Sequence, residues 1–242
     1  MKKQPHLIIG CLLLSLACNL PFFSPKVEST PTQTPPPSPG GEPTSQSSPT
    51  ATPEPPPPYF TEEFDIPSPY WQNLQAGGSQ PAEITTSNGA LQILHNAPDT
   101  WLVGVHVVHS YSNVFVRAKI SLNTRGSAGL ICRYSETDGW YEFDVAGDGA
   151  YYLLYGQWLS PGIVKYIPMV SGQLNLPNGM QNAEIGLFCN DGILDLHVNG
   201  TRIRGYDATN YGLTEGNIGF ATASFTEVPM TASIEWLSVA EK

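Results

Sequence analysis

The sequence predicts an all-β fold, a two-sheet antiparallel jelly-roll sandwich, on the basis of three observations. First, apolar and polar residues alternate with a period of two along several short segments such as 114–120, which is typical of half-buried antiparallel strands. Second, Asn-Gly and Asp-Gly pairs, which favour tight hairpins, separate these segments. Third, no segment of ten or more residues shows the 3.6-residue period of an amphipathic helix. Roughly a dozen strands at this spacing favour a sandwich or jelly roll.

Charge limits the classes of partner. The chain has 242 residues, only 13% of them charged, and a formal net charge of -10. An acidic chain lacks the basic surface that binds nucleic acid or an anionic membrane face, so neither is expected as a charge-driven partner. Neutral carbohydrate and protein partners remain open.

The N-terminal residues predict an exported lipoprotein. Lys2 and Lys3 precede an apolar run, Leu7 to Ala17, which has the length of a signal-peptide core and is too short to span a bilayer. Ser15-Leu16-Ala17-Cys18 resembles the lipobox of bacterial lipoproteins. We therefore expect a signal peptide over 1–17, lipidation of Cys18, and anchoring to the outer face of the bacterial cell membrane. A signal peptide with an incidental cysteine is the alternative.

Residues 18–58 are expected to form a disordered stalk after the anchor cysteine. They are rich in Pro, Ser and Thr, and such a segment buries too little apolar surface to offset its ordering entropy. In an extended proline-rich conformation it would reach on the order of 100 Å. An O-glycosylated tract is the alternative.

The globular domain is expected over 59–242. In its clearest strand, Val114, Val116, Ala118 and Ile120 share one face, and the polar residues face the other way. The same alternation occurs at four further places: Leu91/Ile93, Ile185/Leu187, Leu194/Leu196/Val198 and Ile218/Phe220. Each is bounded by turn residues, which predicts a succession of hairpins.

Several motifs then resemble the concanavalin A-like lectin and glucanase superfamily, particularly the laminarin-binding and 3-keto-disaccharide hydrolase-like group. The matching segments are 60–65 with Trp71 following, the Gly-Leu-Ile-Cys-Arg strand in 126–134, the hairpin 187–200, the Gly-Asn-Ile-Gly-Phe strand 216–220 and the closing strand 232–239. They cover most of 59–242. The resemblance implies the fold and a carbohydrate partner, and it implies no particular activity.

Two cysteines lie outside the N-terminal segment. Cys132 is in phase with apolar residues of its strand, and so is Cys189. An even pair in an exported protein favours a disulfide, so we predict a Cys132–Cys189 bridge. Two buried free thiols are the alternative.

A polar and aromatic strand face is the predicted ligand site. Trp140, Glu142 and Asp144 alternate with core residues, and a flat aromatic beside carboxylates suits the apolar face and the hydroxyls of a sugar ring. Arg133 and His197, with Asp195, are expected to share this face. Trp158 is a further candidate, together with Tyr151 and Tyr155. An ordinary solvated sheet face is the alternative.

Catalysis has less support than binding. Retaining glucanases of this superfamily would carry E-x-D-x-x-E or E-x-D-x-E on one strand, with paired carboxylates at the substrate. Glu142-Phe143-Asp144 has no third acidic residue at either position. Non-catalytic carbohydrate binding is therefore the main hypothesis. An oligosaccharide hydrolase of the 3-keto-glycoside type is one alternative, and a structural or protein-interaction module of the cell envelope is another.

No cofactor or metal is expected. His106 and His109 would lie on opposite faces of one strand, which makes them a poor metal pair. Asp138, Asp148 and Asp191 begin Asp-Gly pairs, which are explained first by turn formation. Structural calcium at these turns is the alternative.

Overall fold

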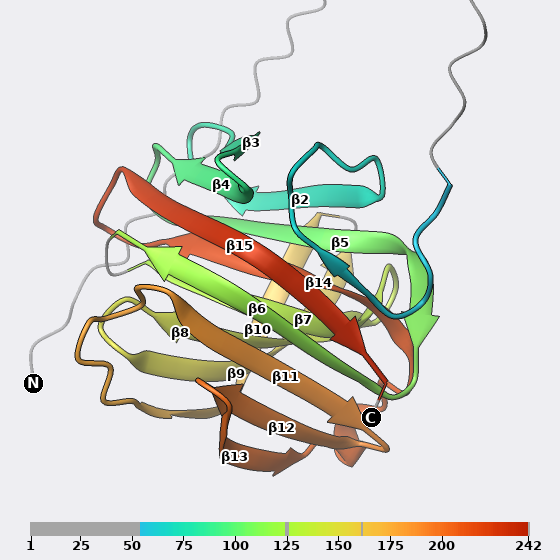
Figure 1. Ribbon diagram of the computed structural model, residues 1–242. Coiled ribbons are helices and arrows are strands. Elements are labelled where there is room, and N and C mark those ends of the chain that lie inside the picture. Colours follow the sequence, from blue (N-terminus) through green and yellow to red (C-terminus); the bar gives the residue numbers. More distant parts are fainter. Residues whose placement is uncertain (1–53, 124–125, 161, 242) are drawn as a thin grey trace, which may run out of the picture. The chain divides into compact units, whose positions relative to one another are not determined.

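A computed structural model describes residues 54–123, 126–160 and 162–241. Within these ranges the chain forms two antiparallel sheets, which lie one behind the other in Figure 1. Sheet A runs in the order β13 (Thr201–Asp207), β12 (Ile193–Val198), β11 (Ala183–Asn190), β6 (Val114–Leu122), β15 (Met230–Ala240), β4 (Ala90–His95) and β3 (Glu83–Ser87), and β1 (Phe60–Glu62) pairs with β15. Sheet B runs β10 (Ile163–Gln173), β9 (Ala150–Ser160), β8 (Gly139–Ala146), β7 (Ser127–Ser135), β14 (Gly216–Ser224), β5 (Thr100–Tyr111) and β2 (Trp71–Gly77). The predicted two-sheet jelly-roll sandwich is confirmed.

The strand alternation and the turns have the predicted local form. Along β6 every second residue is buried, from Val114 to Leu122. Asn88 and Gly89 join β3 to β4 with φ values of 55° and 67°. Asn199 and Gly200 likewise join β12 to β13 with positive φ at both positions. These are the backbone conformations that a two-residue hairpin turn requires, and Asn and Gly adopt them at low cost.

The main core lies between the sheets, and the predicted disulfide crosses it. Cys132 of β7 in sheet B is bonded to Cys189 of β11 in sheet A. Both cysteines are fully buried among the apolar side chains of the two inner faces. The Cys132–Cys189 bridge is thus confirmed, and it links two strands that belong to different sheets.

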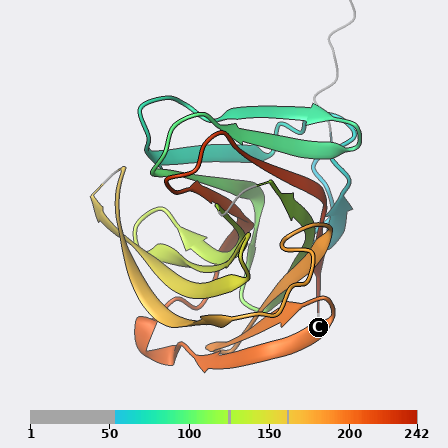
Figure 2. The ribbon, with the colours of Figure 1, turned by 90° about the vertical axis from the view of Figure 1, so that its left-hand side faces the viewer.

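Sheet B also has an apolar cluster on its other face, because the sheet curls strongly. Figure 2 shows β8 to β10, in yellow-green to gold, curving around this face. β2 and β10 are the two edges of sheet B, yet residues of both line one cavity of about 120 Å³. The curvature therefore turns the concave face of sheet B into a narrow cleft with its own packed floor.

Part of the predicted organisation lies outside the described residues. This applies to the signal segment 1–17, to Cys18 and to the stalk as far as residue 53. Regular structure within the described ranges begins with β1 at Phe60 and ends with β15 at Ala240. No helix in that part of the chain is long and apolar enough to cross a membrane.

Candidate functional site

Trp140, Glu142 and Asp144 share the concave face of sheet B, as their alternation predicts, but they are not open to solvent. Trp140 and Glu142 are each 1% exposed and Asp144 is 4% exposed. The alternative of an ordinary solvated sheet face is therefore wrong, because all three side chains are buried. The cause is the curl of sheet B, which brings Trp158, Val164 and other side chains of β9 and β10 over β8.

Two glycines on the neighbouring strands make room for these side chains. Gly156 of β9 pairs with Trp140, and a Cβ at position 156 would come 2.6 Å from the indole. Gly129 of β7 pairs with Asp144, and a Cβ at position 129 would overlap the Asp144 carboxyl. The absence of side chains at these positions lets a tryptophan and a carboxyl group lie flat against the sheet.

The two buried carboxyl groups form one hydrogen-bonded network. Trp140 Nε1 donates to Glu142 Oε2 over 2.7 Å. Glu142 is also hydrogen-bonded to Asp144 and to Tyr166 of β10, and Asp144 is hydrogen-bonded to Ser127. Asp144 Oδ1 has no partner. Such a network tolerates one negative charge poorly and two very poorly.

Burial accordingly raises the pKa of both carboxyl groups. For Glu142 the cause is loss of hydration, partly offset by its hydrogen bonds to Asp144, Trp140 and Tyr166. For Asp144 the pKa lies well above its usual value, because of burial first and the neighbouring Glu142 second. Like-charged neighbours in a low dielectric hold a proton between them. The pair thus keeps at least one proton to a higher pH than exposed carboxylates do.

An aromatic cleft lies above this network. We use that name for the cavity of about 120 Å³ whose walls include Trp101, Trp158 and Tyr166 and whose floor is Trp140. The rings of Trp140 and Trp158 are 5.3 Å apart and nearly edge-to-face. Trp158 Nε1 donates to the Ser135 carbonyl over 3.0 Å, which fixes the indole. The structure thus brings the predicted residues Trp140 and Trp158 together.

Trp101 and Tyr166 were not among the residues predicted from the sequence. Trp101 is two residues from Val103 and four from Val105, so the sequence alone places the three side chains on one face of β5. Tyr166 gives no such signal, because the curl of sheet B places it over β8. The predicted candidates Tyr151 and Tyr155 lie on the opposite face of β9, in the main core.

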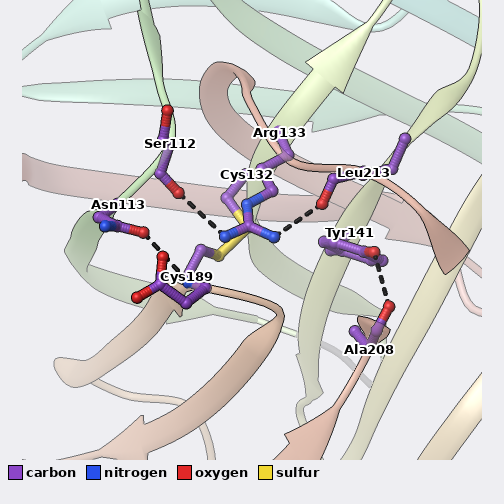
Figure 3. The surroundings of a disulfide bond; sticks show 9 residues. Ser112, Asn113, Cys132, Arg133, Tyr141, Cys189, Ala208 and Leu213 are labelled. Carbon is purple, nitrogen blue, oxygen red and sulfur yellow. Dashed lines mark hydrogen bonds between the residues drawn. A yellow bond between two sulfur atoms is a disulfide. The ribbon is translucent and has the colours of Figure 1, made fainter. Parts of the chain in front are cut away.

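Arg133 does not share the concave face, contrary to expectation. It has φ 54° within a bulge of β7 between Cys132 and Ser135, so the strand alternation stops there. Its guanidinium donates to the Leu213 carbonyl over 2.7 Å and to the Ser112 carbonyl over 2.9 Å (Figure 3). Arg133 therefore joins two loops at one end of the sandwich.

His197 and Asp195 also lie elsewhere. Both belong to β12 in sheet A, so they do not lie on the concave face of sheet B beside Trp140. The His197 ring packs 5.0 Å from Phe115, and Asp195 forms an ion pair with Arg202 over 2.7 Å. The alternation of β12 correctly predicts that these side chains point away from the main core, but alternation cannot assign a strand to a sheet.

The expectation that His106 and His109 lie on opposite faces is wrong as well. Their rings are 6.4 Å apart, because β5 carries extra residues between His106 and Tyr111 relative to β14. Burial, and then the nearby His109, lower the pKa of His106 to about 4. Among the described residues no group of three or more His, Cys, Asp or Glu side chains could hold a metal ion. The expectation of no metal, and calcium at the Asp-Gly turns as its alternative, both stay untested.

Comparison with known proteins places the fold. No protein-family model matches the chain, and no curated protein matches it. A β-glucanase from Bacillus licheniformis superposes with a TM-score of 0.54 at 13% identity, over 76% of this chain and 98% of its own. A Bacillus subtilis protein of unknown function with a galectin-like fold superposes with a TM-score of 0.57 at 15% identity, over 75% of this chain and 94% of its own. The carbohydrate-binding module CBM66 from Bacillus subtilis superposes with a TM-score of 0.50 at 12% identity, over 68% of this chain and 91% of its own.

These likenesses show that the domain has the concanavalin A-like jelly-roll fold, which confirms the resemblance seen in its motifs. At such low identity they show the fold alone, and one fold supports many activities. The chemistry of this chain has to be argued from its own side chains.

The geometry limits what the cleft can catalyse. A retaining glycosidase needs two carboxyl groups that flank the scissile bond. Here Glu142 and Asp144 are hydrogen-bonded to each other beneath Trp140 and Tyr166. The two positions where a third acidic residue could follow hold Ala146 and Gly147. The side chains that line the cleft are mainly apolar, four of them aromatic, which suits binding more than bond cleavage.

Proposed function

We propose that this protein binds carbohydrate without cleaving it, and that the aromatic cleft contributes to the binding site. The observation that carries the proposal is the set of three tryptophans, Trp101, Trp140 and Trp158, around one cavity on the concave face of sheet B. Aromatic faces contact the axial hydrogens of sugar rings, and the Gln75 amide, which also lines the cavity, can meet their hydroxyls. The fold supports the proposal, because β-glucanases and a carbohydrate-binding module have it too.

In the cell we propose that the domain acts as an exported lipoprotein, anchored by Cys18 to the outer face of the bacterial membrane. Residues 18–58 would then be the stalk that holds the domain away from the lipid surface. The basic start, apolar core and lipobox-like residues support this proposal. Metabolic labelling with a palmitate analogue tests it: the label should be incorporated by the natural chain and lost in Cys18→Ser.

The binding proposal is tested with the full chain and a panel of neutral polysaccharides that includes mixed-linkage β-1,3-1,4-glucan. This glucan is chosen because β-1,3-1,4-glucanases are among the similar structures. We expect Trp158→Ala to weaken binding at least about tenfold, because truncation of a tryptophan at the centre of a contact costs about 2 kcal/mol or more. Isothermal titration calorimetry measures the affinity.

Trp236→Ala is the matched control, since Trp236 is a partly exposed tryptophan of β15 in sheet A. It should leave the affinity unchanged. Full affinity in a folded Trp158→Ala protein would remove the cleft from the site. No binding to any neutral polysaccharide in the panel would contradict the function itself.

Hydrolysis is the second candidate, and the raised pKa of Glu142 and Asp144 is the observation that favours it. Raised pKa values are typical of carboxyl groups that act as general acids. If the protein cleaves oligosaccharides, turnover should be lost in Glu142→Gln while binding persists. Reducing-end assays over the same panel decide the matter, and absence of any released sugar supports binding alone.

A further inference from the structure

A second hollow lies at one end of the sandwich, apart from the aromatic cleft. We call it the end hollow. It encloses about 620 Å³, against about 120 Å³ for the cleft. The side chains around it include three tyrosines, two carboxylates and an amide: Tyr134, Tyr155, Tyr211, Asp138, Glu215 and Asn217. Among the residues that the structure describes, no Lys, Arg or His side chain lines it.

One wall of the end hollow is the turn between β7 and β8, and this wall is held in place by hydrogen bonds. Ser135 and Thr137 each donate a hydroxyl hydrogen to Asp138 Oδ2 over 2.9 Å. The Tyr155 hydroxyl donates to the Asp138 carbonyl over 2.9 Å. A carboxylate and a tyrosine ring are therefore presented to the hollow in a fixed arrangement, so that a ligand would lose little free energy in ordering them.

Another wall is the segment 212–216, which runs from the end of the 3-10 helix η1 (Thr209–Tyr211) to the first residue of β14. Buried Arg133 donates to the Leu213 carbonyl over 2.7 Å and so ties this segment to the sandwich. Asn217 Nδ2 donates to the His109 carbonyl over 2.9 Å and fixes the start of β14 against β5. Thr214 and Glu215 remain exposed at the rim, free to meet a ligand.

The end hollow borders the proposed binding cleft. Tyr134 lines the hollow, and its ring packs 5.7 Å from Trp140 and 6.5 Å from Trp158. Ser135, also in the lining, accepts the hydrogen bond from Trp158 Nε1. One saccharide chain could therefore contact both places, with Tyr134 and Ser135 between them.

We propose that the end hollow is a second saccharide subsite that takes a neutral sugar unit. The half-buried Tyr211 ring offers an apolar face, and Asp138, Glu215 and Asn217 offer acceptors and a donor for sugar hydroxyls. Carboxylates with no cation beside them repel uronic acids and phosphorylated sugars, so the hollow selects neutral saccharides over anionic ones. The ligand class rests on the proposed function, while the site itself is additional to it.

Thr214→Trp tests the subsite, because a large side chain at this exposed rim position fills the hollow without disturbing the core. The probe is the neutral polysaccharide that binds best in the panel, with polygalacturonate as the anionic comparison. We expect Thr214→Trp to weaken binding of the neutral probe at least about tenfold and Glu215→Gln to weaken it about fivefold. Polygalacturonate should bind more weakly than the neutral probe.

Thr201→Trp, at an exposed threonine that begins β13, and Glu241→Gln are the matched controls. Each variant is first shown to be folded by thermal melting. Unchanged affinity in Thr214→Trp, with loss in Trp158→Ala, would overturn the subsite and leave the aromatic cleft in place. Loss of affinity in Thr214→Trp but not in Trp158→Ala would support the end hollow as a binding site and would show that the aromatic cleft does not bind the saccharide. Preference for polygalacturonate, or no saccharide binding at all, would overturn the subsite.

Discussion

Glu142 and Asp144 are both buried, and loss of hydration is the first cause that raises the pKa of each carboxyl group. Because the folded state raises the pKa of both groups, it binds more protons than the unfolded state does above the ordinary carboxyl range. The free energy of unfolding therefore falls as pH rises above about 4, until the folded-state pKa values are passed. The buried pair thus contributes stability at acidic pH that is lost towards neutral pH.

Asp144→Asn isolates this effect, because the amide has the size of the carboxyl group and does not ionise. We expect the melting temperature of the variant, relative to the natural protein, to be higher at pH 8 than at pH 4 by at least about 2 °C. Calorimetric melting between pH 4 and pH 8 measures the difference. Glu241→Gln, which removes an exposed carboxylate, should show no such trend. A variant whose stability changes equally at every pH would instead indicate that folding does not raise the pKa of Asp144.

At the scale of elements, local chemistry predicts hairpins well and bulges poorly. The β3–β4 turn follows from Asn88-Gly89 alone, because only the two turn residues need positive φ. The bulge that turns Arg133 away from the concave face depends on how β7 pairs with both β8 and β14. β14 is distant from β7 in the sequence, so a sequence pattern does not contain the joint pairing of β7 with β8 and β14.

Arg133→Met tests what the Arg133 side chain does at this bulge. Loss of the two hydrogen bonds to the Leu213 and Ser112 carbonyls should free the segment 212–216, and the amides of that segment should exchange with solvent at least about tenfold faster. Hydrogen exchange followed by mass spectrometry measures this, with the β12–β13 hairpin as an internal reference. An equal increase in both regions would mean that Arg133 stabilises the whole domain and has no local effect on the rim of the end hollow.

At the scale of the whole molecule, the sequence predicts which face a side chain belongs to and misses what covers that face. Trp140, Glu142 and Asp144 do share a face, yet they are buried because β10 curls towards β2 at the far edge of the same sheet. Trp158 and Trp140, both candidates from the sequence, do lie together, since β8 and β9 are consecutive strands of one hairpin. Tyr166 and the end hollow depend on curvature and on loops from distant strands, which is why sequence reasoning missed them.

The disulfide cross-links a strand of one sheet to a strand of the other. Its removal should affect both the stability of the domain and the proposed subsite. Cys132 and Cys189 are 57 residues apart, and opening a loop of this size costs about 4 kcal/mol in the chain-entropy model. For a domain of this size that corresponds to a fall in melting temperature of about 8–16 °C in Cys132→Ala/Cys189→Ala. Reductant should lower the melting temperature of the natural protein similarly and leave the double variant unchanged.

The bridge also holds β7 in place at Cys132, the residue directly before Arg133. Arg133 in turn fixes the segment 212–216 through its hydrogen bond to the Leu213 carbonyl. The double variant should therefore bind the neutral probe more weakly even at a temperature where it is fully folded, whereas the affinity of Trp236→Ala should not change. Equal affinity in the folded double variant would show that Arg133 keeps its position through its own two hydrogen bonds. The sheets would then be joined covalently for stability alone.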